Sequence, residues 1–240
     1  SSNKRGQVHK NITRSQMNKM IIFGEGKYAE QAYYYFTNDS PHEVVAFTAD
    51  EAYIQKTDLF GLPIIPFEKI EAQYPPNEYK MFVALGYQNM NKLRASKYEA
   101  AREKGYELVS YISSKACNYG GVEFGDNCFI LDNAVIQPCS KIGSNVYIWS
   151  GNHVGHHASV GDHCYIAGQA VISGSTSIGP YCFVGVNATI GHEIIVGEES
   201  LIGAGAVITK DVSPKSVHIV ESTPKLRLPS DKFLLMTKMK

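Results

Sequence analysis

Apolar residues recur at every sixth position through the second half of the chain. Residues 124–213 divide into fifteen blocks of six residues without insertion or deletion. Each block begins with Phe, Ile or Val, nine have Gly second, and the fifth residue is small or β-branched except for Asn152. We expect the first and fifth residues to face the interior, and the glycines, which lack a Cβ, to allow tight turning. A six-residue period is typical of a parallel β-helix, and three blocks to a coil give about five coils.

Three cysteines follow the same period. Cys128, Cys164 and Cys182 occupy the fifth position of their blocks and are separated by six and then three blocks, which are whole coils. We therefore expect them on one inner wall, with the last two as neighbours. Such a column is either a metal or disulfide site or small apolar filler, and buried free cysteine commonly serves as filler. Cys117 and Cys139 show no ligand pattern.

Residues 18–115 show a different pattern, in which short apolar runs alternate with helical stretches. Strands are predicted at 20–24, 44–48, 63–65, 81–86 and 107–112, and helices at 27–36 and 91–104. This alternation predicts a parallel sheet with right-handed crossovers. We therefore expect an α/β Rossmann-like domain that binds its ligand at the carboxyl ends of its strands.

The first predicted strand ends in a glycine motif. Gly24, Gly26 and Ala29 form a GxGxxA sequence that opens a helix, whose N-terminal amides can hold a phosphate. About 100 residues are too few for a six-stranded dinucleotide fold, so a mononucleotide or nucleotide sugar is favoured over NAD. The alternative is a glycine turn used only for packing.

Composition excludes several classes of function. The 240 residues carry 23 basic and 23 acidic side chains, so no general attraction to nucleic acid or anionic membrane is expected. No apolar run approaches the ~20 residues of a membrane span, and a cytoplasmic protein is expected. The predicted organisation is a disordered leader or remnant of cloning (1–16), a nucleotide-sugar-binding domain (17–116), a β-helix (117–220) and a tail (221–240).

These features together resemble a known family. The IIFGEG segment with its helix, the VALGYQN segment and the repeat track resemble the PglD/NeuD-type sugar acyltransferases of the hexapeptide-repeat superfamily, over roughly residues 18–220. The resemblance implies a left-handed β-helix and a homotrimer. It also implies acetyl-CoA as cosubstrate between adjacent helices, a nucleotide-linked amino sugar on the N-terminal domain, and no metal.

The resemblance points to a general base. In that family a β-helix histidine, often followed by Glu, is proposed as the base. The matching residue is His156, followed here by His157, so both are catalytic candidates whose orienting partner stays open. His192 and Glu193 lie two coils further on. Imidazole titrates near neutral pH and can accept the proton of an attacking group. The alternatives are a metal site between subunits and histidines without a chemical role.

The remaining site residues fall into two groups. The tail from 210 to 240 has seven Lys or Arg against three acids, which suits the phosphates of CoA or is simply solvated. The acetyl-CoA contacts expected are Tyr165, Gly174, Gly203, Ala204, Gly205 and Lys210. The nucleotide-sugar contacts expected are Gly24, Gly26, Lys27, Tyr28, Thr48, Asp50, Gly86 and Asn89.

The predicted activity is transfer of acetyl from acetyl-CoA to the amine of a UDP-, dTDP- or GDP-linked amino-deoxysugar. Products of this kind feed surface glycans such as the O-antigen of lipopolysaccharide. The alternatives are O-acetylation of a sugar, as in NeuD-type relatives, a non-catalytic trimeric binding protein and, more remotely, a metal-dependent hydratase.

Overall fold

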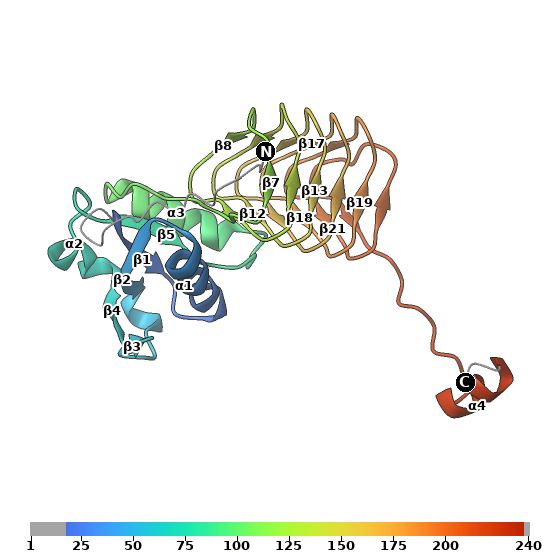
Figure 1. Cartoon of the computed structure of the whole chain (residues 1–240), viewed down its shortest axis with the longest axis horizontal. Coiled ribbons are helices and arrows are strands. Elements are labelled where there is room, and N and C mark those ends of the chain that lie inside the picture. Colours follow the sequence, from blue (N-terminus) through green and yellow to red (C-terminus); the bar gives the residue numbers. More distant parts are fainter. Residues whose placement is uncertain (1–17, 238–240) are drawn as a thin grey trace, which may run out of the picture.

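The computed structural model describes residues 18–237 as an α/β domain, a parallel β-helix and a terminal arm (Figure 1). The predicted leader lies outside the described residues. Among those residues, no helix has the length and apolar character needed to cross a membrane.

The α/β domain is built on a five-stranded sheet in the order β3-β4-β2-β1-β5. Four strands run parallel, and the short β3 is antiparallel to β4, so the sheet is mixed. The parallel strands follow the order third, second, first, fourth, which is that of the first half of a doubly wound sheet. The bounds are Asn18–Phe23 (β1), His42–Ala49 (β2), Asp58–Leu59 (β3), Leu62–Pro66 (β4) and Lys80–Val83 (β5).

Two helices agree with the predicted ones. α1 (Lys27–Asp39) buries Ala29, Ala32 and Phe36, whose spacing of three and four positions places them on one face. α3 spans Lys92–Glu103. The structure adds α2 (Ile70–Gln73) and two 3-10 helices (Glu51–Tyr53 and Phe67–Lys69), which are too short to produce a periodic pattern.

The predicted strand at 107–112 is divided between the two domains. Leu108 forms a bridge with Met81 at the edge of the first sheet, whereas Tyr111 pairs with Phe129 of the β-helix. Coiling therefore begins before the predicted start at 117. The sequence did not show this because the block around Tyr111 lacks the Ile or Val followed by Gly that marks later coils.

The β-helix consists of three parallel sheets with six, five and seven strands, so the stack is taller than the five predicted coils. Each strand pairs with the strand three blocks further on, as in Val135 with His153, which confirms three blocks to a coil. The strands are β6 (Tyr111–Ile112), β7 (Cys117–Asn118), β8 (Glu123–Phe124), β9 (Phe129–Ile130), β10 (Val135–Ile136), β11 (Lys141–Ile142), β12 (Tyr147–Ile148), β13 (His153–Val154), β14 (Ser159–Val160), β15 (Tyr165–Ile166), β16 (Val171–Ile172), β17 (Ser177–Ile178), β18 (Phe183–Val184), β19 (Thr189–Ile190), β20 (Ile195–Val196), β21 (Leu201–Ile202), β22 (Val207–Ile208) and β23 (Val217–His218).

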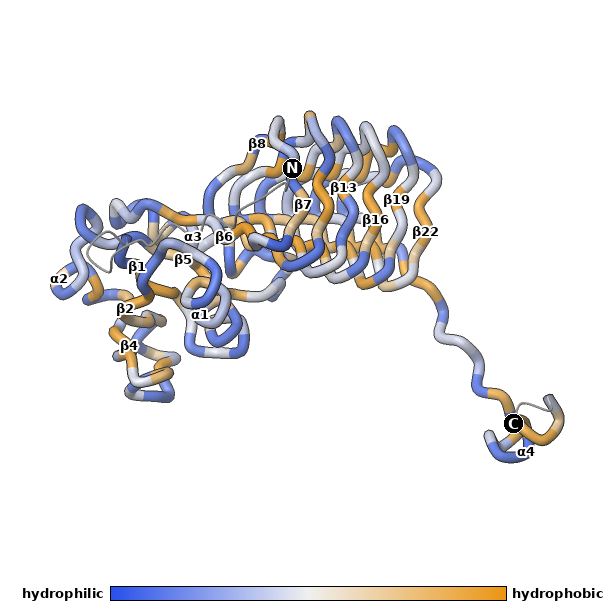
Figure 2. Tube along the Cα trace, viewed as in Figure 1, coloured by the Kyte–Doolittle hydropathy of each residue, from blue (hydrophilic) through white to orange (hydrophobic). Residues whose placement is uncertain are grey.

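One residue of each strand points inward and the other outward. The inward Ile and Val residues, with the Ala and Cys residues that precede the strands, form a continuous core. Figure 2 shows hydrophobic positions recurring along the coils. The outward residues distinguish the three sheets. We name the aromatic face after Tyr111, Phe129, Tyr147, Tyr165 and Phe183; the valine face after Val135, Val171 and Val207, with His153 and Thr189 between them; and the serine face after Ser159 and Ser177.

The inner cysteines are free and fully buried, as expected of filler. Each thiol donates to a glycine carbonyl of the next coil, at 3.0 Å for Cys128, 3.1 Å for Cys164 and 3.2 Å for Cys182. Burial raises the pKa of Cys128 to about 12, so this thiol stays protonated.

The glycines at the second block position have a role other than the turning predicted for them. Left-handed φ occurs instead at the fourth position, for example 59° at His157, 57° at Ser175 and 58° at Glu193. A Cβ on Gly161 would lie 2.7 Å from the backbone nitrogen of Pro180 in the next coil. The second-position glycines therefore allow close stacking of successive coils.

The α/β domain packs against the aromatic face of the β-helix. Tyr147 donates through its hydroxyl to the carbonyl of Val83 at 2.6 Å, and Asn127 accepts from the Val83 amide at 2.8 Å. Both side chains are almost wholly buried. Buried hydrogen bonds of this kind fix the two domains to each other.

After β23 the chain leaves the body of the protein as an extended arm that ends in α4 (Ser230–Thr237), seen at the lower right of Figure 1. Leu226, Leu235 and Met236 on this arm are mostly exposed. The described part of the predicted tail therefore contacts solvent.

Candidate functional site

A pocket of about 310 Å³ opens at the carboxyl ends of β1, β2 and β5. At this edge the strand order reverses, because the chain passes from β1 to β2 on one side and later to β5 on the other. Nucleotides bind at such switch points. The lining is mostly apolar and includes three charged side chains, of which Asp50, just after β2, and Lys97 of α3 form an ion pair. The residues are Phe23, Gly24, Glu25, Gly26, Ala49, Asp50, Tyr53, Leu85, Leu93 and Lys97.

The glycine loop of the pocket is shaped by two different requirements. Gly24 has a φ of 128°, and a Cβ there would lie 2.8 Å from the carbonyl oxygen of Ala84. Gly26 caps α1, and a Cβ on it would meet no atom within 4 Å. Since Lys27 is exposed at the first position of α1, the loop offers free amides and a cation to an anion.

The pocket contains an ion pair, and only one of its two partners was predicted from the sequence. Asp50 and Lys97 lie 2.8 Å apart, and their side chains are 20% and 23% exposed. The predicted Asp50 is thus present but already paired. No sequence pattern indicated Lys97, because packing of α3 alone brings it to the carboxyl end of β2.

Other predicted substrate residues do not line this pocket. Thr48 is fully buried, and its hydroxyl donates to the carbonyl of Ile65 at 2.7 Å. Gly86 is buried against the Tyr28 ring, 2.6 Å from where its Cβ would be. Tyr28 turns toward the β-helix, and Asn89 is exposed with a φ of 50°. These four residues therefore lie outside the pocket lining.

Tyr165, predicted to contact acetyl-CoA, belongs to the domain interface instead. Its side chain is 5% exposed, stacks on Phe183 and shares a 3.1 Å hydroxyl contact with Tyr28. Burial raises the pKa of this phenol, and the hydrogen bond to Tyr28 adds to the effect. An outward position on a β-helix is accessible only if nothing covers its face, and the α/β domain covers this one.

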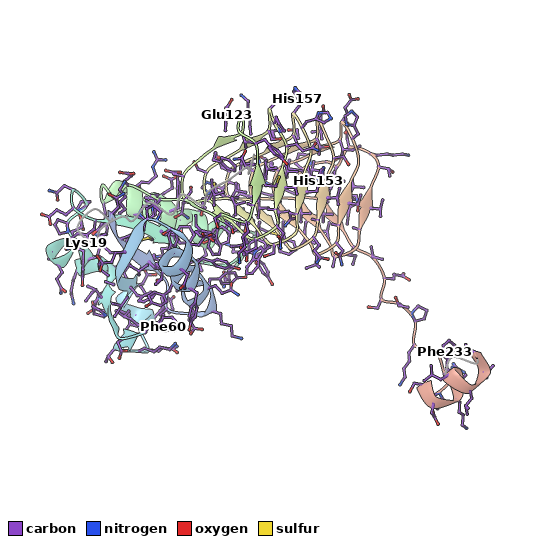
Figure 3. All side chains as sticks on the ribbon, in the orientation of Figure 1. Lys19, Phe60, Glu123, His153, His157 and Phe233 are labelled. Atoms are coloured by element: carbon purple, nitrogen blue, oxygen red, sulfur yellow. The ribbon has the colours of Figure 1, made fainter. Side chains whose placement is uncertain are left out.

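The two histidine candidates share a corner between β13 and β14. Their Nδ1 atoms lie 3.1 Å apart, and their ring planes are nearly perpendicular at 84°. The backbone amide of His156 donates to Oε1 of Gln137 at 2.9 Å, which fixes the start of the corner. Figure 3 shows His157 at the outer edge of the β-helix, away from Lys19 and Phe60 of the α/β domain.

Gly174, the next residue along this corner, lies directly against His156. A Cβ at Gly174 would be 2.9 Å from both Cε1 and Nε2 of the imidazole. One coil further, the His192 ring centre is 6.2 Å from that of His156, and Nε2 of His192 is 3.2 Å from Oε1 of Glu193. The His156 ring therefore fits in this position only because residue 174 has no side chain.

His153 and His163, which are close to His156 in sequence, lie in different parts of the structure. His153 lies on the valine face, whereas His163 is buried at the domain interface, where its Nδ1 is 2.9 Å from Nδ2 of Asn145. Burial lowers the pKa of His163. Within residues 18–237 no three His, Cys, Asp or Glu side chains are arranged to hold a metal ion.

The other predicted acetyl-CoA residues occupy two corners. Lys210 lies on the corner of His156, three coils beyond it. Gly203, Ala204 and Gly205 form the corner between β21 and β22, at the opposite edge of the valine face. The valine face thus lies between these two corners.

The β-helix matches a known repeat family. Residues 121–154, 140–174 and 175–210 match the bacterial transferase hexapeptide repeat, so this part of the chain is similar to the repeats of bacterial transferases. No curated protein sequence matches the chain.

Solved structures with the same two-part architecture identify the fold more closely. PerB from Caulobacter crescentus, in complex with CoA and GDP-perosamine, is 24% identical with a TM-score of 0.74, over 83% of this chain and 92% of that chain. The acetyltransferase domain of PglB from Neisseria gonorrhoeae FA1090 is 22% identical with a TM-score of 0.72, over 83% and 95%. WeeI from Acinetobacter baumannii AYE is 20% identical with a TM-score of 0.71, over 82% and 94%. The resemblance to PglD/NeuD-type sugar acyltransferases is confirmed, at the level of repeat and fold.

Proposed function

We propose that the protein transfers acetyl from acetyl-CoA to the amine of a nucleotide-linked amino sugar, with His156 as general base. The observation that carries this proposal is an exposed histidine held against Gly174 on a hexapeptide-repeat helix. A nucleotide-sized pocket at the sheet edge of the same chain supports it. The similar PerB structure contains CoA and GDP-perosamine, and variants of that protein replace one histidine by Asn or Ala.

The chemistry requires a base beside the acceptor nitrogen. A sugar amine must be free of its extra proton to attack a thioester, and a positioned base is typically worth ~10²–10⁴ in rate. His156 is exposed, and its Nε2 faces Gly174, so an acceptor can approach this nitrogen from solvent. Backbone N–H groups at the same corner can stabilise charge that develops on the acetyl oxygen.

Acetyl-CoA supplies an activated acetyl group, and the chain has residues suited to hold it. A Cβ on Gly205 would meet no atom within 4 Å, so the backbone at Gly205 is open to a narrow pantetheine chain, whereas Gly203 packs against the carbonyl of His218. Lys210 is exposed on the corner of His156 and suits a phosphate. Gly174 keeps the space beside the base free.

The pocket and the base lie on different sides of one chain. The α/β domain covers the aromatic face, whereas His156 lies where the valine and serine faces meet. We therefore infer that the active site forms between copies, in a homotrimer of left-handed helices packed through the valine face. Val207 on that face is 68% exposed, and a trimer would cover it. The sugar nucleotide on one copy would then meet His156 of another.

The test is release of free thiol from acetyl-CoA with a panel of UDP-, dTDP- and GDP-linked 3- and 4-amino sugars. We expect turnover with one nucleotide, and a His156→Asn variant that still binds CoA but loses about 10²–10⁴ in kcat. Near-normal turnover in that variant refutes His156 as the base. If acetyl-CoA binds but no amine reacts, the hydroxyl analogues test for O-acetylation. Failure to bind acetyl-CoA at all identifies a non-catalytic protein.

A further inference from the structure

His157 directly follows the proposed base in the chain, and its ring faces that base. Consecutive side chains of a strand point to opposite sides. Here the left-handed φ of 59° at His157 turns its ring back, and the two Nδ1 atoms come within 3.1 Å. Asn, Ser and Glu adopt the same conformation at this position in other coils, so the fold itself brings the two rings together.

Only one proton fits between the two facing nitrogens, so one ring donates and the other accepts. If His156 donates from Nδ1, its Nε2 is unprotonated and can act as a base. If His157 donates, Nε2 of His156 carries the proton and cannot accept another. The direction of this single hydrogen bond therefore decides whether the base is active.

We propose that His157 is the positioning residue of His156: it accepts a hydrogen bond from Nδ1–H of His156 and so leaves Nε2 free to take the proton of the acceptor. This inference rests on the proposed function. The dyad consists of two imidazoles, unlike a histidine–carboxylate pair. When His156 takes the proton, the charge is held by a hydrogen bond to His157, whose exposed ring passes it to solvent.

The neighbouring titratable groups do not compete with His157 as the hydrogen-bond partner of His156. On the coil after next, the carboxylate of Glu193 is directed to His192 at 3.2 Å. On the preceding coil, the titratable neighbour in the same column is Cys139, which is exposed. Among the described residues, no carboxylate forms a hydrogen bond or ion pair with His156 or His157. The positioning partner of the base is thus an imidazole.

The experiment compares two substitutions that suit the left-handed backbone. His157→Gly removes the ring and keeps the conformation without strain. His157→Glu places a carboxylate there, and Glu193 shows that Glu adopts this conformation in the same repeat. Cys139→Ser, one coil away in the same column, is the control. The full-length protein is used throughout.

Two measurements separate a positioning role from a structural one. Nitrogen-15 NMR of the histidine rings reports which nitrogen of His156 is protonated, whether or not the protein acetylates a sugar. We expect Nδ1–H in the unaltered protein, Cys139→Ser and His157→Glu, and mainly Nε2–H in His157→Gly. We also expect kcat of His157→Gly to fall by about 10- to 100-fold with an unchanged KM for acetyl-CoA.

The glutamate variant gives the sharpest outcome. His157→Glu should restore most of kcat and move the acidic limb of the rate profile to higher pH, because a carboxylate favours the protonated form of its neighbour. The proposal is overturned if His157→Gly keeps both its rate and its tautomer, if its rate falls with the tautomer unchanged, or if glutamate does not restore activity. A normal rate in His156→Asn would instead overturn the proposed function, while the tautomer of His156 in the unaltered protein still reports on the dyad.

Discussion

The guanidinium of Arg94 lies 4.5 Å from the centre of the Tyr147 ring, with both side chains almost completely buried. Its Nε donates to Oδ1 of Asn145 at 3.1 Å, and its Nη2 donates to the carbonyl of His163 at 2.9 Å. Nη1 donates to the carbonyl of Gly86 at 2.8 Å. A single arginine of α3 thus connects the α/β domain to two successive coils of the β-helix, where backbone and amide oxygens accept its hydrogen bonds.

Replacement of this arginine should strongly destabilise the protein. Arg94→Met retains much of the volume but leaves several buried acceptors without their donor, and the loss of such a charged group costs about 3–5 kcal/mol. Chemical denaturation at fixed protein concentration measures the free energy of unfolding. Arg102→Met is the control, because Arg102 is exposed on the same helix, and a change below about 1 kcal/mol is expected there. Equal effects of the two substitutions would contradict the interface role of Arg94.

Gly174→Ala should remove activity while the fold persists. The new methyl group would lie 2.9 Å from Nε2 of His156 and displace the ring. Because a base out of position loses its contribution of ~10²–10⁴, kcat should fall within that range, as measured by thiol release. Gly168→Ala is the matched control, since Gly168 has the same place in the preceding block and a Cβ there meets its nearest atom at 3.4 Å. Similar kcat values in both variants would show that Gly174 has no steric role.

Lys97→Met should weaken binding of the sugar nucleotide. Lys97 brings a cation to the pocket beside the N-terminus of α1, and a hydrogen bond to a charged group contributes about 1.5–3 kcal/mol. Calorimetry should therefore show affinity reduced about tenfold or more. Asp50→Asn, which frees Lys97 from its partner, should not weaken binding. Weaker binding in Asp50→Asn together with normal binding in Lys97→Met would reverse this assignment and support the predicted contact of Asp50 with the nucleotide. Lys104→Met, at the end of the same helix and paired with Glu71, is the control.

Stability should fall as the pH drops below about 6.5, the ordinary pKa of histidine. Burial lowers the pKa of His163 in the folded protein. The unfolded chain therefore binds more protons in this window, so stability rises with pH. Each histidine of this kind contributes a slope of at most about 1.4 kcal/mol per pH unit. His42, whose pKa burial also lowers, acts in the same direction.

The hydrogen bonds of Asn145 explain why His163 must be neutral. Its Oδ1 accepts from Arg94 and Asn127, so its Nδ2 is the group that donates to Nδ1 of His163. His163→Gln preserves an acceptor and should flatten the decline in unfolding free energy between pH 6.5 and 5.5. His218→Gln, on the last strand, should leave it unchanged. An unaltered slope in His163→Gln would exclude this histidine as the source.

The elements predicted best are those whose cause is local. The six-residue period of the β-helix follows from residues that all make the same inward contact, so coil length and the shared column of His156 and His192 could be predicted from spacing alone. Gly24 could be placed because its left-handed φ and the end of a buried strand coincide. Asp50 followed from the same rule about strand ends.

The residues that sequence reasoning missed or misplaced are those whose roles depend on packing between distant segments of the chain. Lys97 and Arg94 lie on a polar helix face whose partners come from distant parts of the chain. Thr48 and Tyr165 were assigned to ligands although packing covers both. A signal for Tyr165 was present: outward residues one coil apart are aromatic from Tyr111 to Phe183, whereas those of the other two faces are mostly small or polar. That stripe marks the face that the α/β domain covers.

The position of Arg94 has a consequence for how such a chain can vary in length. Its contacts with Asn145 and His163 are one coil apart and bracket the single coil that carries His156. Arg94 thereby holds the α/β domain, with its sugar pocket, at the level of the coil that carries His156. Whole coils, each about 4.8 Å high, can be added or removed C-terminal to this coil without changing the position of the pocket relative to the base. Evolution is free to adjust the far end of the helix to the acyl carrier while the acceptor site keeps its register.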